Sequence, residues 1–176
     1  MAAQSPVTPA GSEFVITRVF NAPRNAVWKA WTEAEHLKQW WGPVGFSMIA
    51  CTVDLRPGGL FHYGMKAPNG FEMWGKFVYR EIVAPTRLVF TNAFSDKEGN
   101  TLRHFGSATW PLEVLNTATF TEQGGKTTVT LAGGPINSTD IERATFQSAF
   151  ASMEQGFGGT FDQLADYLAQ SARQEK

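Results

Sequence analysis

The stretch that decides the fold is MEQGFGGTFDQLADYL, residues 153–168. Its apolar side chains recur at spacings of 4, 4, 3 and 4 residues, at Met153, Phe157, Phe161, Leu164 and Leu168. This period places them along one stripe of an amphipathic helix. Such a stripe must cover an apolar surface, which the residues before the helix have to supply.

Three glycines interrupt this helix, at Gly156, Gly158 and Gly159. Each of them makes a helix less stable than alanine would, by about 0.8–1 kcal/mol. One explanation is a kink or a close contact with a neighbouring element. The other is that the missing side chains leave room for a ligand beside the backbone. Both explanations stay open, and they can hold together.

Upstream of this helix, from about residue 44 to residue 132, the apolar pattern has a period of two, which is typical of strands. An earlier apolar segment, EFVITRVFNAP, has the same strand character. Short turns such as Pro68-Asn69-Gly70 and Gln123-Gly124-Gly125 separate the runs, so the sheet is predicted to be antiparallel. The runs expected to contain strands are residues 13–23, 45–59, 60–67, 71–85, 86–94 and the hairpin 110–133.

Two short helices are expected between the first strand and the sheet. Asn21 is predicted to cap the first helix. Thr32 and Glu35 have the T-x-x-E spacing of a capping box, and the second helix is predicted to stop at Gly42-Pro43. Thr139 and Glu142 form another such box at the start of the helical tail. The predicted class is α+β, with six to seven antiparallel strands and one long C-terminal helix.

The bulk composition indicates a single soluble domain. With 176 residues, we expect a flexible leader at 1–12, one domain at 13–170 and a tail at 171–176. The 15 basic and 16 acidic residues give no basic field, so nucleic acid is not an expected partner. We find no signal peptide and no membrane-spanning run, and Cys51 is the only cysteine. These features predict a cytoplasmic protein without disulfides and without membrane insertion.

Two adjacent tryptophans, Trp40 and Trp41, end the second predicted helix. Neighbouring side chains on a helix diverge by about 100°. One indole can therefore enter the core while the other covers the mouth of a cavity, and the residues alone do not say which. The alternative is that both close the end of the sheet as ordinary core residues.

No catalytic residue, metal site or cofactor is predicted. The three histidines lack the spacing of metal ligands; His36 is expected on the surface, and Cys51 as an inert buried thiol. The many aromatic side chains do not by themselves indicate a function, but they supply enough bulk to line a cavity. The candidate ligand-binding residues are Trp40, Trp41, Phe61, Tyr63, Met65, Trp74, Phe90, Asn92, His104, Trp110, Phe150, Phe157 and Phe161.

Four segments carry a resemblance to a known family: residues 20–43, 53–63, 79–91 and 153–168. In order and character they resemble the SRPBCC superfamily, which has the START and birch-pollen-allergen type of helix-grip fold. Within it, they are most similar to the branch homologous to the C-terminal domain of the activator of Hsp90 ATPase. The resemblance implies a curved sheet wrapped around the long C-terminal helix, with a cavity between them.

The resemblance and the aromatic lining together predict a protein that binds a small apolar molecule. Two alternatives stay open: an enzyme of the polyketide cyclase or aromatase type, and a stress-linked module that binds other proteins. Hsp90 is not an expected partner, because the activator's function relies on a further N-terminal domain that nothing in this sequence matches. A homodimer is an open alternative, because exposed aromatic side chains can form a patch.

Overall fold

The computed structural model describes residues 13–174, and the predicted leader at 1–12 lies outside this range. Residues 171–174 of the predicted tail continue the last helix. The elements in chain order are β1 (Phe14–Phe20), α1 (Arg24–Thr32), α2 (Ala34–Trp40), β2 (Ser47–Val53), β3 (Leu60–Lys66), β4 (Glu72–Val83), β5 (Arg87–Ser95), β6 (Thr101–Leu102), β7 (Val114–Gln123), β8 (Lys126–Pro135), α3 (Asp140–Ser148) and α4 (Phe150–Gln174).

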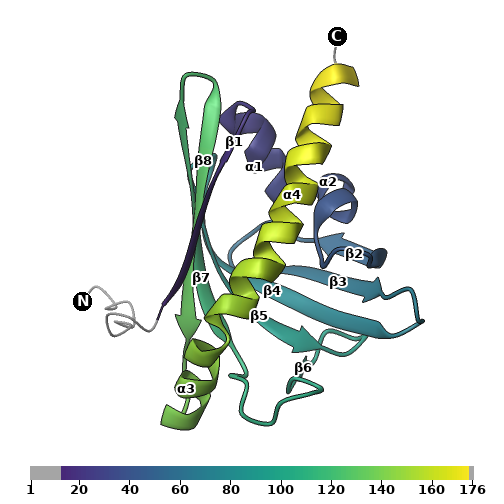
Figure 1. Cartoon of the computed structure of the whole chain (residues 1–176), viewed down its shortest axis with the longest axis vertical. Helices are drawn as coiled ribbons and strands as arrows, with labels where there is room; N and C mark the ends of the chain where they lie inside the picture. The colour runs from purple at the N-terminus through teal and green to yellow at the C-terminus, as the bar shows by residue number, and fades with distance from the viewer. Residues whose placement is uncertain (1–12, 175–176) are drawn as a thin grey trace.

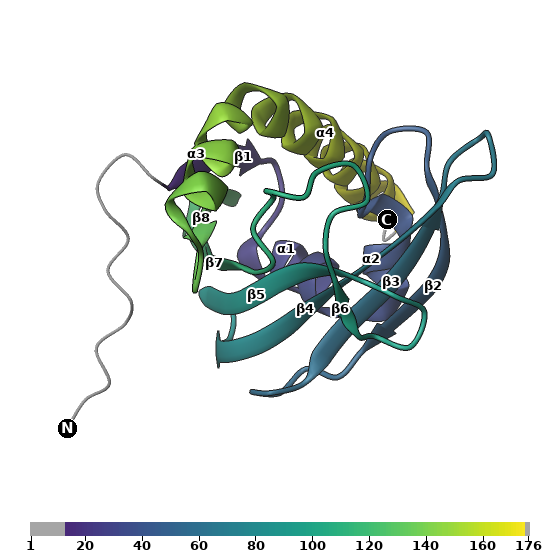
Figure 2. The ribbon, with the colours of Figure 1, turned by 90° about the horizontal axis from the view of Figure 1, so that it is seen from below.

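The strands form one antiparallel sheet, as predicted. Its order is β1-β8-β7-β5-β4-β3-β2, and the two-residue strand β6 pairs with β5 beside this path. The sheet bends strongly, and α4 crosses its concave face (Figure 1). The view from below shows the strands curving around α4, with α1 and α2 appearing between the strands and α4 (Figure 2). The predicted α+β helix-grip architecture is therefore confirmed.

The stripe of α4 divides into two halves with different packing. In its C-terminal half, Phe161 and Leu164 are 0% exposed and pack into the main core. Phe161 contacts Phe20 on β1 and Trp31 on α1, with ring centroids 5.9 and 6.0 Å apart. In its N-terminal half, Met153 and Phe157 are only half-buried. The helix therefore packs tightly against the sheet at one end and loosely at the other.

The first two helices start differently from the sequence prediction. Helix α1 begins at Arg24, and its cap residue, Pro23, provides no side-chain hydrogen bond, so Asn21 is not the cap. The predicted capping box at Thr32 is also wrong. The Thr32 hydroxyl donates a hydrogen bond backwards to the carbonyl of Trp28 at 2.8 Å, and Glu33 occupies the cap position of α2. A threonine at a helix end can bond to the preceding turn instead of the next one.

The helical tail is split by a break at Ala149, where a single long helix was predicted. The capping box at the start of α3 is confirmed, because Glu142 N–H donates to Thr139 Oγ1 at 3.1 Å and Thr139 N–H donates to Glu142 Oε1 at 3.0 Å. Glu142 also accepts a hydrogen bond from Arg103 Nη1 at 2.6 Å. This carboxylate therefore ties α3 to the loop that follows β6.

We expect Glu142 to contribute to the loss of stability of the protein at acidic pH. The Thr139 backbone N–H, and then the Arg103 side chain, hold the pKa of Glu142 below its ordinary 4.5. A lowered carboxyl pKa stabilises the fold above the unfolded pKa, and this contribution is lost as pH falls through the folded pKa. Thermal unfolding of Glu142→Gln should therefore change less between pH 7 and pH 4 than that of the wild type. An identical pH dependence in both proteins would contradict this role.

None of the helices within residues 13–174 combines the length and hydropathy that crossing a bilayer requires.

Candidate ligand-binding site

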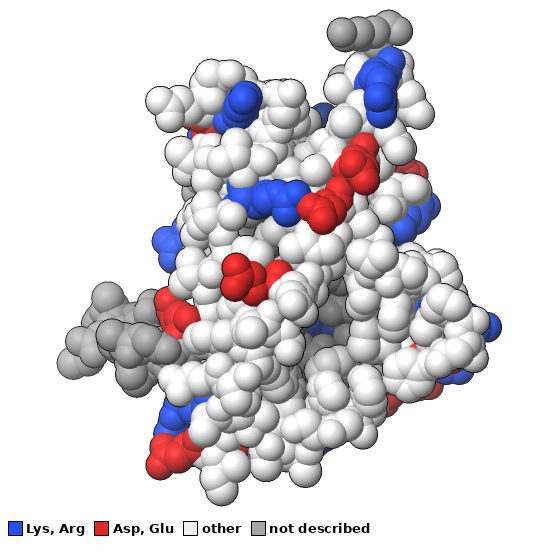
Figure 3. Space-filling model, viewed as in Figure 1, with Lys and Arg blue, Asp and Glu red and all other residues white. Residues whose placement is uncertain are grey.

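A cavity lies where the N-terminal half of α4 packs loosely over the sheet, and we call it the grip cavity. Its outer chamber has a volume of about 250 Å³ and is walled by the Trp41–Pro43 turn, by strands β3 and β4, and by α4. Figure 3 shows a hollow on this side of α4, with a rim that is largely uncharged. The lining residues of the outer chamber are Trp41, Gly42, Pro43, Tyr63, Met65, Met73, Phe94, Met153, Gly156, Phe157 and Thr160.

The inner chamber of the grip cavity is smaller and more enclosed. It measures about 150 Å³ and shares three side chains with the outer chamber: Phe94, Met153 and Phe157. The two chambers therefore adjoin beneath α4. The remaining lining residues of the inner chamber are Phe14, Asn92, Ala93, Trp110, Pro111, Val114, Asn116, Gly133 and Phe146.

The two adjacent tryptophans take different positions. Trp40 is 1% exposed, and its indole N–H donates to the carbonyl of Ala30 at 2.9 Å, so it belongs to the core. Trp41 lines the outer chamber and contacts Phe77 edge-to-face, with ring centroids 5.2 Å apart. Helix α4 fixes this turn, because Gln163 Nε2 donates to the carbonyls of Trp40 and Gly42 at 3.2 and 2.8 Å. Of the pair, Trp41 therefore faces the cavity.

Tyr63 is positioned by a close contact across the sheet. It pairs with Gly75 in the β3–β4 register, and a Cβ at Gly75 would lie 2.6 Å from the Tyr63 hydroxyl oxygen. The aromatic ring thus lies over a residue that has no side chain. Burial raises the pKa of Tyr63 to about 12, and the neighbouring Trp41 opposes this only partly. At neutral pH the group is a neutral phenol, which can donate a hydrogen bond but is not a base.

Two of the three glycines of α4 fit the two explanations left open by the sequence. Gly156 lines the outer chamber, and an added Cβ would meet no atom within 4 Å. At Gly159 a Cβ would lie 3.0 Å from Val44 Cγ2, so this glycine allows a close contact with the turn before β2. Gly158 also has open space around it, but it does not line either chamber.

Six of the predicted site residues meet around the grip cavity: Trp41, Tyr63, Met65, Asn92, Trp110 and Phe157. Five others lie in the hydrophobic packing around it and line neither chamber: Trp40, Phe61, Phe90, Phe150 and Phe161. Trp74 lies on the opposite face of the sheet. It pairs with Gly64, its ring packs 5.4 Å from that of His62, and it lines a separate hollow of about 280 Å³.

His104 lies behind the cavity wall and does not line either chamber. Its ring packs against Phe94 and Phe105, with centroids 4.8 and 4.5 Å away. Its Nδ1 accepts a hydrogen bond from the Gly106 N–H at 2.8 Å, which leaves the proton of the neutral ring on Nε2. Burial lowers the pKa of His104. Its contacts support the wall residue Phe94.

The sequence prediction missed several lining residues of the two chambers, and for three of them a signal was present in the sequence. Phe94 continues the alternation of Phe90 and Asn92 along β5, and Met153 belongs to the helical stripe. Asn116 occupies the inward phase of β7, between the buried Val114 and Ala118. A polar residue in an otherwise apolar phase indicates a hydrogen-bonded group in the interior.

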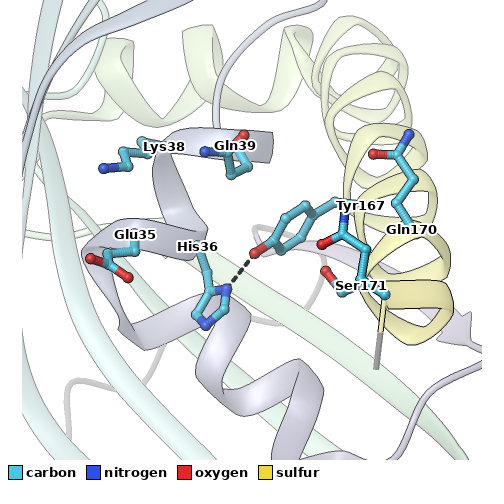
Figure 4. A pocket seen from close by; sticks show the side chains of 8 residues that line it. Glu35, His36, Lys38, Gln39, Tyr167, Gln170 and Ser171 are labelled. Atoms are coloured by element: carbon cyan, nitrogen blue, oxygen red, sulfur yellow. Dashed lines mark hydrogen bonds between the residues drawn. The ribbon is translucent and has the colours of Figure 1, made fainter. Parts of the chain in front are cut away.

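A second, polar hollow of about 390 Å³ lies between α2 and the C-terminal part of α4. His36 and Tyr167 point toward each other there and are hydrogen-bonded, while Glu35 and Lys38 point away from Tyr167 (Figure 4). His36 is half-buried at the surface, where it lines this hollow, and its ring is paired with Tyr167. Within residues 13–174, no group of three or more histidine, cysteine, aspartate or glutamate side chains could hold a metal ion.

Solved structures share this architecture. A Mycobacterium smegmatis crystal structure is 25% identical, with a TM-score of 0.73 over 90% of this chain and 91% of that one. A Nitrosomonas europaea crystal structure is 26% identical, with a TM-score of 0.73 over 94% and 99% of the two chains. A Staphylococcus epidermidis solution structure is 26% identical, with a TM-score of 0.74 over 95% of each chain. No curated protein matches the sequence.

The family model described as "Activator of Hsp90 ATPase homolog 1-like protein" matches residues 21–169. This range begins after β1 and includes both short helices, the rest of the sheet and most of α4. Together with the shared fold, it identifies a domain of the ligand-binding type. The chain therefore belongs to the family of Activator of Hsp90 ATPase homolog 1-like proteins, within the SRPBCC superfamily.

Proposed function

We propose that this protein binds a small, mainly apolar molecule in the grip cavity, in the cytoplasm, without transforming it. The observation that carries the proposal is the pair of adjoining chambers, of about 250 and 150 Å³, walled by aromatic and methionine side chains. Binding sites for small molecules are typically concave and mostly apolar, with a few polar groups. Both chambers have this character.

The lining supports binding more than acid–base catalysis. Tyr63 is the one ionisable side chain among the described residues of the two chambers, and its pKa of about 12 keeps it protonated at neutral pH. A general base works best when its pKa lies near the working pH. Neither the cyclase alternative nor the protein-interaction alternative has a specific observation that favours it over ligand binding in the grip cavity.

The test compares two leucine substitutions in α4 and uses the neutral fluorescent probe N-phenyl-1-naphthylamine. Gly156→Leu places a side chain at the outer chamber, and Gly158→Leu adds the same side chain two residues away, at a residue that lines neither chamber. Leucine favours a helix more than glycine does, so both variants should fold. We expect the dissociation constant of the probe to rise about tenfold or more in Gly156→Leu and to stay near the wild-type value in Gly158→Leu.

Probe emission at increasing probe concentration gives the dissociation constants of the wild type and the two variants, and circular dichroism checks that the variants keep the wild-type fold. If the wild-type protein does not bind the probe, or if both leucine variants bind it as the wild type does, the grip cavity is not a binding site for apolar molecules and the proposal fails.

A further inference from the structure

The inner chamber contains a pair of amide side chains in otherwise apolar surroundings. Asn92 lies on β5 and Asn116 on the neighbouring strand β7, and both line the chamber. Asn116 is only 9% exposed. A polar side chain buried this deeply destabilises a protein unless its hydrogen-bonding groups find partners. The partners of the two amides therefore decide what the chamber can accept.

The hydrogen bonds determine the orientation of both side-chain amide groups, that is, which end is the oxygen and which the nitrogen. Asn116 Nδ2 donates to Asn92 Oδ1 at 2.7 Å and to the carbonyl of Val114 at 3.2 Å. If the Asn116 amide were turned over, its oxygen would face the Val114 carbonyl, which cannot donate. In this arrangement, no other group within residues 13–174 donates to Asn116 Oδ1 or accepts from Asn92 Nδ2. Among the described residues, Asn116 Oδ1 and Asn92 Nδ2 therefore have no partner, and both asparagines line the inner chamber.

The opposite strand makes room for this arrangement. Gly133 on β8 pairs with Asn116, and a Cβ at Gly133 would lie 2.3 Å from Asn116 Oδ1. The amide oxygen can lie over the sheet there only because residue 133 has no side chain. The lining of the inner chamber thus combines a fixed acceptor, a fixed donor and an absent side chain.

Charged groups are absent from the described lining of both chambers. Arg103 is close to Trp110, but its guanidinium donates to the carboxylate of Glu142 at 2.6 Å and to the carbonyl of Trp110 at 3.3 Å. It is therefore engaged elsewhere. An anionic ligand would lose its hydration in this cavity without meeting a compensating cation, which is costly.

We infer that the inner chamber selects uncharged ligands with a terminal carbonyl or carboxamide group. The ligand oxygen accepts a hydrogen bond from Asn92 Nδ2, and a ligand N–H donates to Asn116 Oδ1. The apolar body of the ligand lies between Phe94, Trp110 and Phe157. This inference rests on the proposed function, because it describes how the same cavity discriminates among apolar molecules.

The experiment uses three probes of the same shape: naphthalene, 2-naphthamide and 2-naphthoate. Two added hydrogen bonds, each of modest net strength, should make the amide bind about tenfold more tightly than the hydrocarbon. The carboxylate should bind more weakly than the amide. Isothermal titration at pH 7.5 gives the three dissociation constants for the wild-type protein.

The decisive variant is Asn92→Asp, which keeps an oxygen to accept from Asn116, removes the free N–H donor and adds a carboxylate charge. We expect it to lose the tenfold preference for 2-naphthamide. Asn25→Asp, at an exposed position on α1, introduces the same charge outside the cavity lining and should keep the preference. In the wild-type protein, the side-chain amide resonances of Asn92 should shift further with 2-naphthamide than with naphthalene, because a hydrogen bond adds to the ring-current shift that both probes cause. This measurement needs no variant.

The outcomes separate the two proposals. If naphthalene and 2-naphthamide bind the wild type equally, or Asn92→Asp keeps the preference, the inference about the amide pair is overturned while the grip cavity remains a binding site. If none of the three probes binds and N-phenyl-1-naphthylamine does not bind either, the proposed function fails and the inference fails with it.

Discussion

Replacing Trp40 with alanine is expected to lower the free energy of unfolding by about 3–5 kcal/mol, the usual result of removing a large buried aromatic side chain. Trp40 is 1% exposed, and its ring lies 5.3 Å from that of Trp31 and 5.6 Å from that of Trp41. The variant also leaves the Ala30 carbonyl without its indole donor. Urea unfolding followed by circular dichroism measures the loss.

Trp41→Ala is the matched control, because it removes the same side chain from the next residue. Trp41 contacts more aromatic rings than Trp40 does, but it is half-buried and borders the outer chamber, so less buried apolar surface is lost when it is removed. We expect a clearly smaller loss of stability than for Trp40→Ala, together with weaker binding of N-phenyl-1-naphthylamine. Equal losses of stability in the two variants would mean that Trp41 is as much a core residue as Trp40.

Gly75→Ala is expected to reduce both stability and binding. The added Cβ would lie 2.6 Å from the hydroxyl oxygen of Tyr63 and 2.7 Å from its ring carbon Cζ. The ring cannot bend away freely, because Phe61, Trp41 and Phe77 surround it at 4.8, 5.9 and 6.1 Å. Overpacking of this kind typically costs about 1–3 kcal/mol. A displaced ring would also enter the outer chamber, so probe affinity should fall about tenfold.

The double variant Tyr63→Leu/Gly75→Ala tests the cause of this loss. With the ring removed, the alanine methyl group has space, so the two substitutions should be less destabilising together than the sum of their separate effects. Denaturant unfolding of the two single variants and the double variant gives this coupling. If the losses of stability in the two single variants simply add in the double variant, the contact with Tyr63 is not the reason why Gly75→Ala is destabilising.

The fold was predictable because local patterns agreed with the tertiary structure. The apolar spacing of residues 153–168 predicted the gripping helix, and the alternation on β3 placed Phe61, Tyr63 and Met65 on one face. The box at Thr139 and Glu142 formed as predicted because both of its hydrogen bonds are local. Thr32 has the same spacing to its glutamate, but its hydroxyl bonds to the preceding turn, a competition that spacing alone does not decide.

The site was only partly predictable, because its lining depends on register and on how fully each gap is filled. Gly75 pairs with Tyr63 and so shares the cavity face of the sheet with it. Trp74, the preceding residue, therefore points to the other face. Phe90 has the same inward phase as Asn92, but it stacks on Phe77 at 4.0 Å and leaves no space beside it. Single-sequence alternation identifies a face of a strand, and only the packed partners determine whether that face meets core or cavity.

The position of α4 in the chain has a consequence for synthesis. The ribosome synthesises the strands before the helix that covers the concave face of the sheet. Strand β1 can pair with β8, as Phe14 does with Gly133, only after β8 has been made. Such distant pairings raise the contact order, which slows folding. For that interval the aromatic floor of the grip cavity faces water, so newly made chains have their greatest tendency to aggregate just before the last helix emerges.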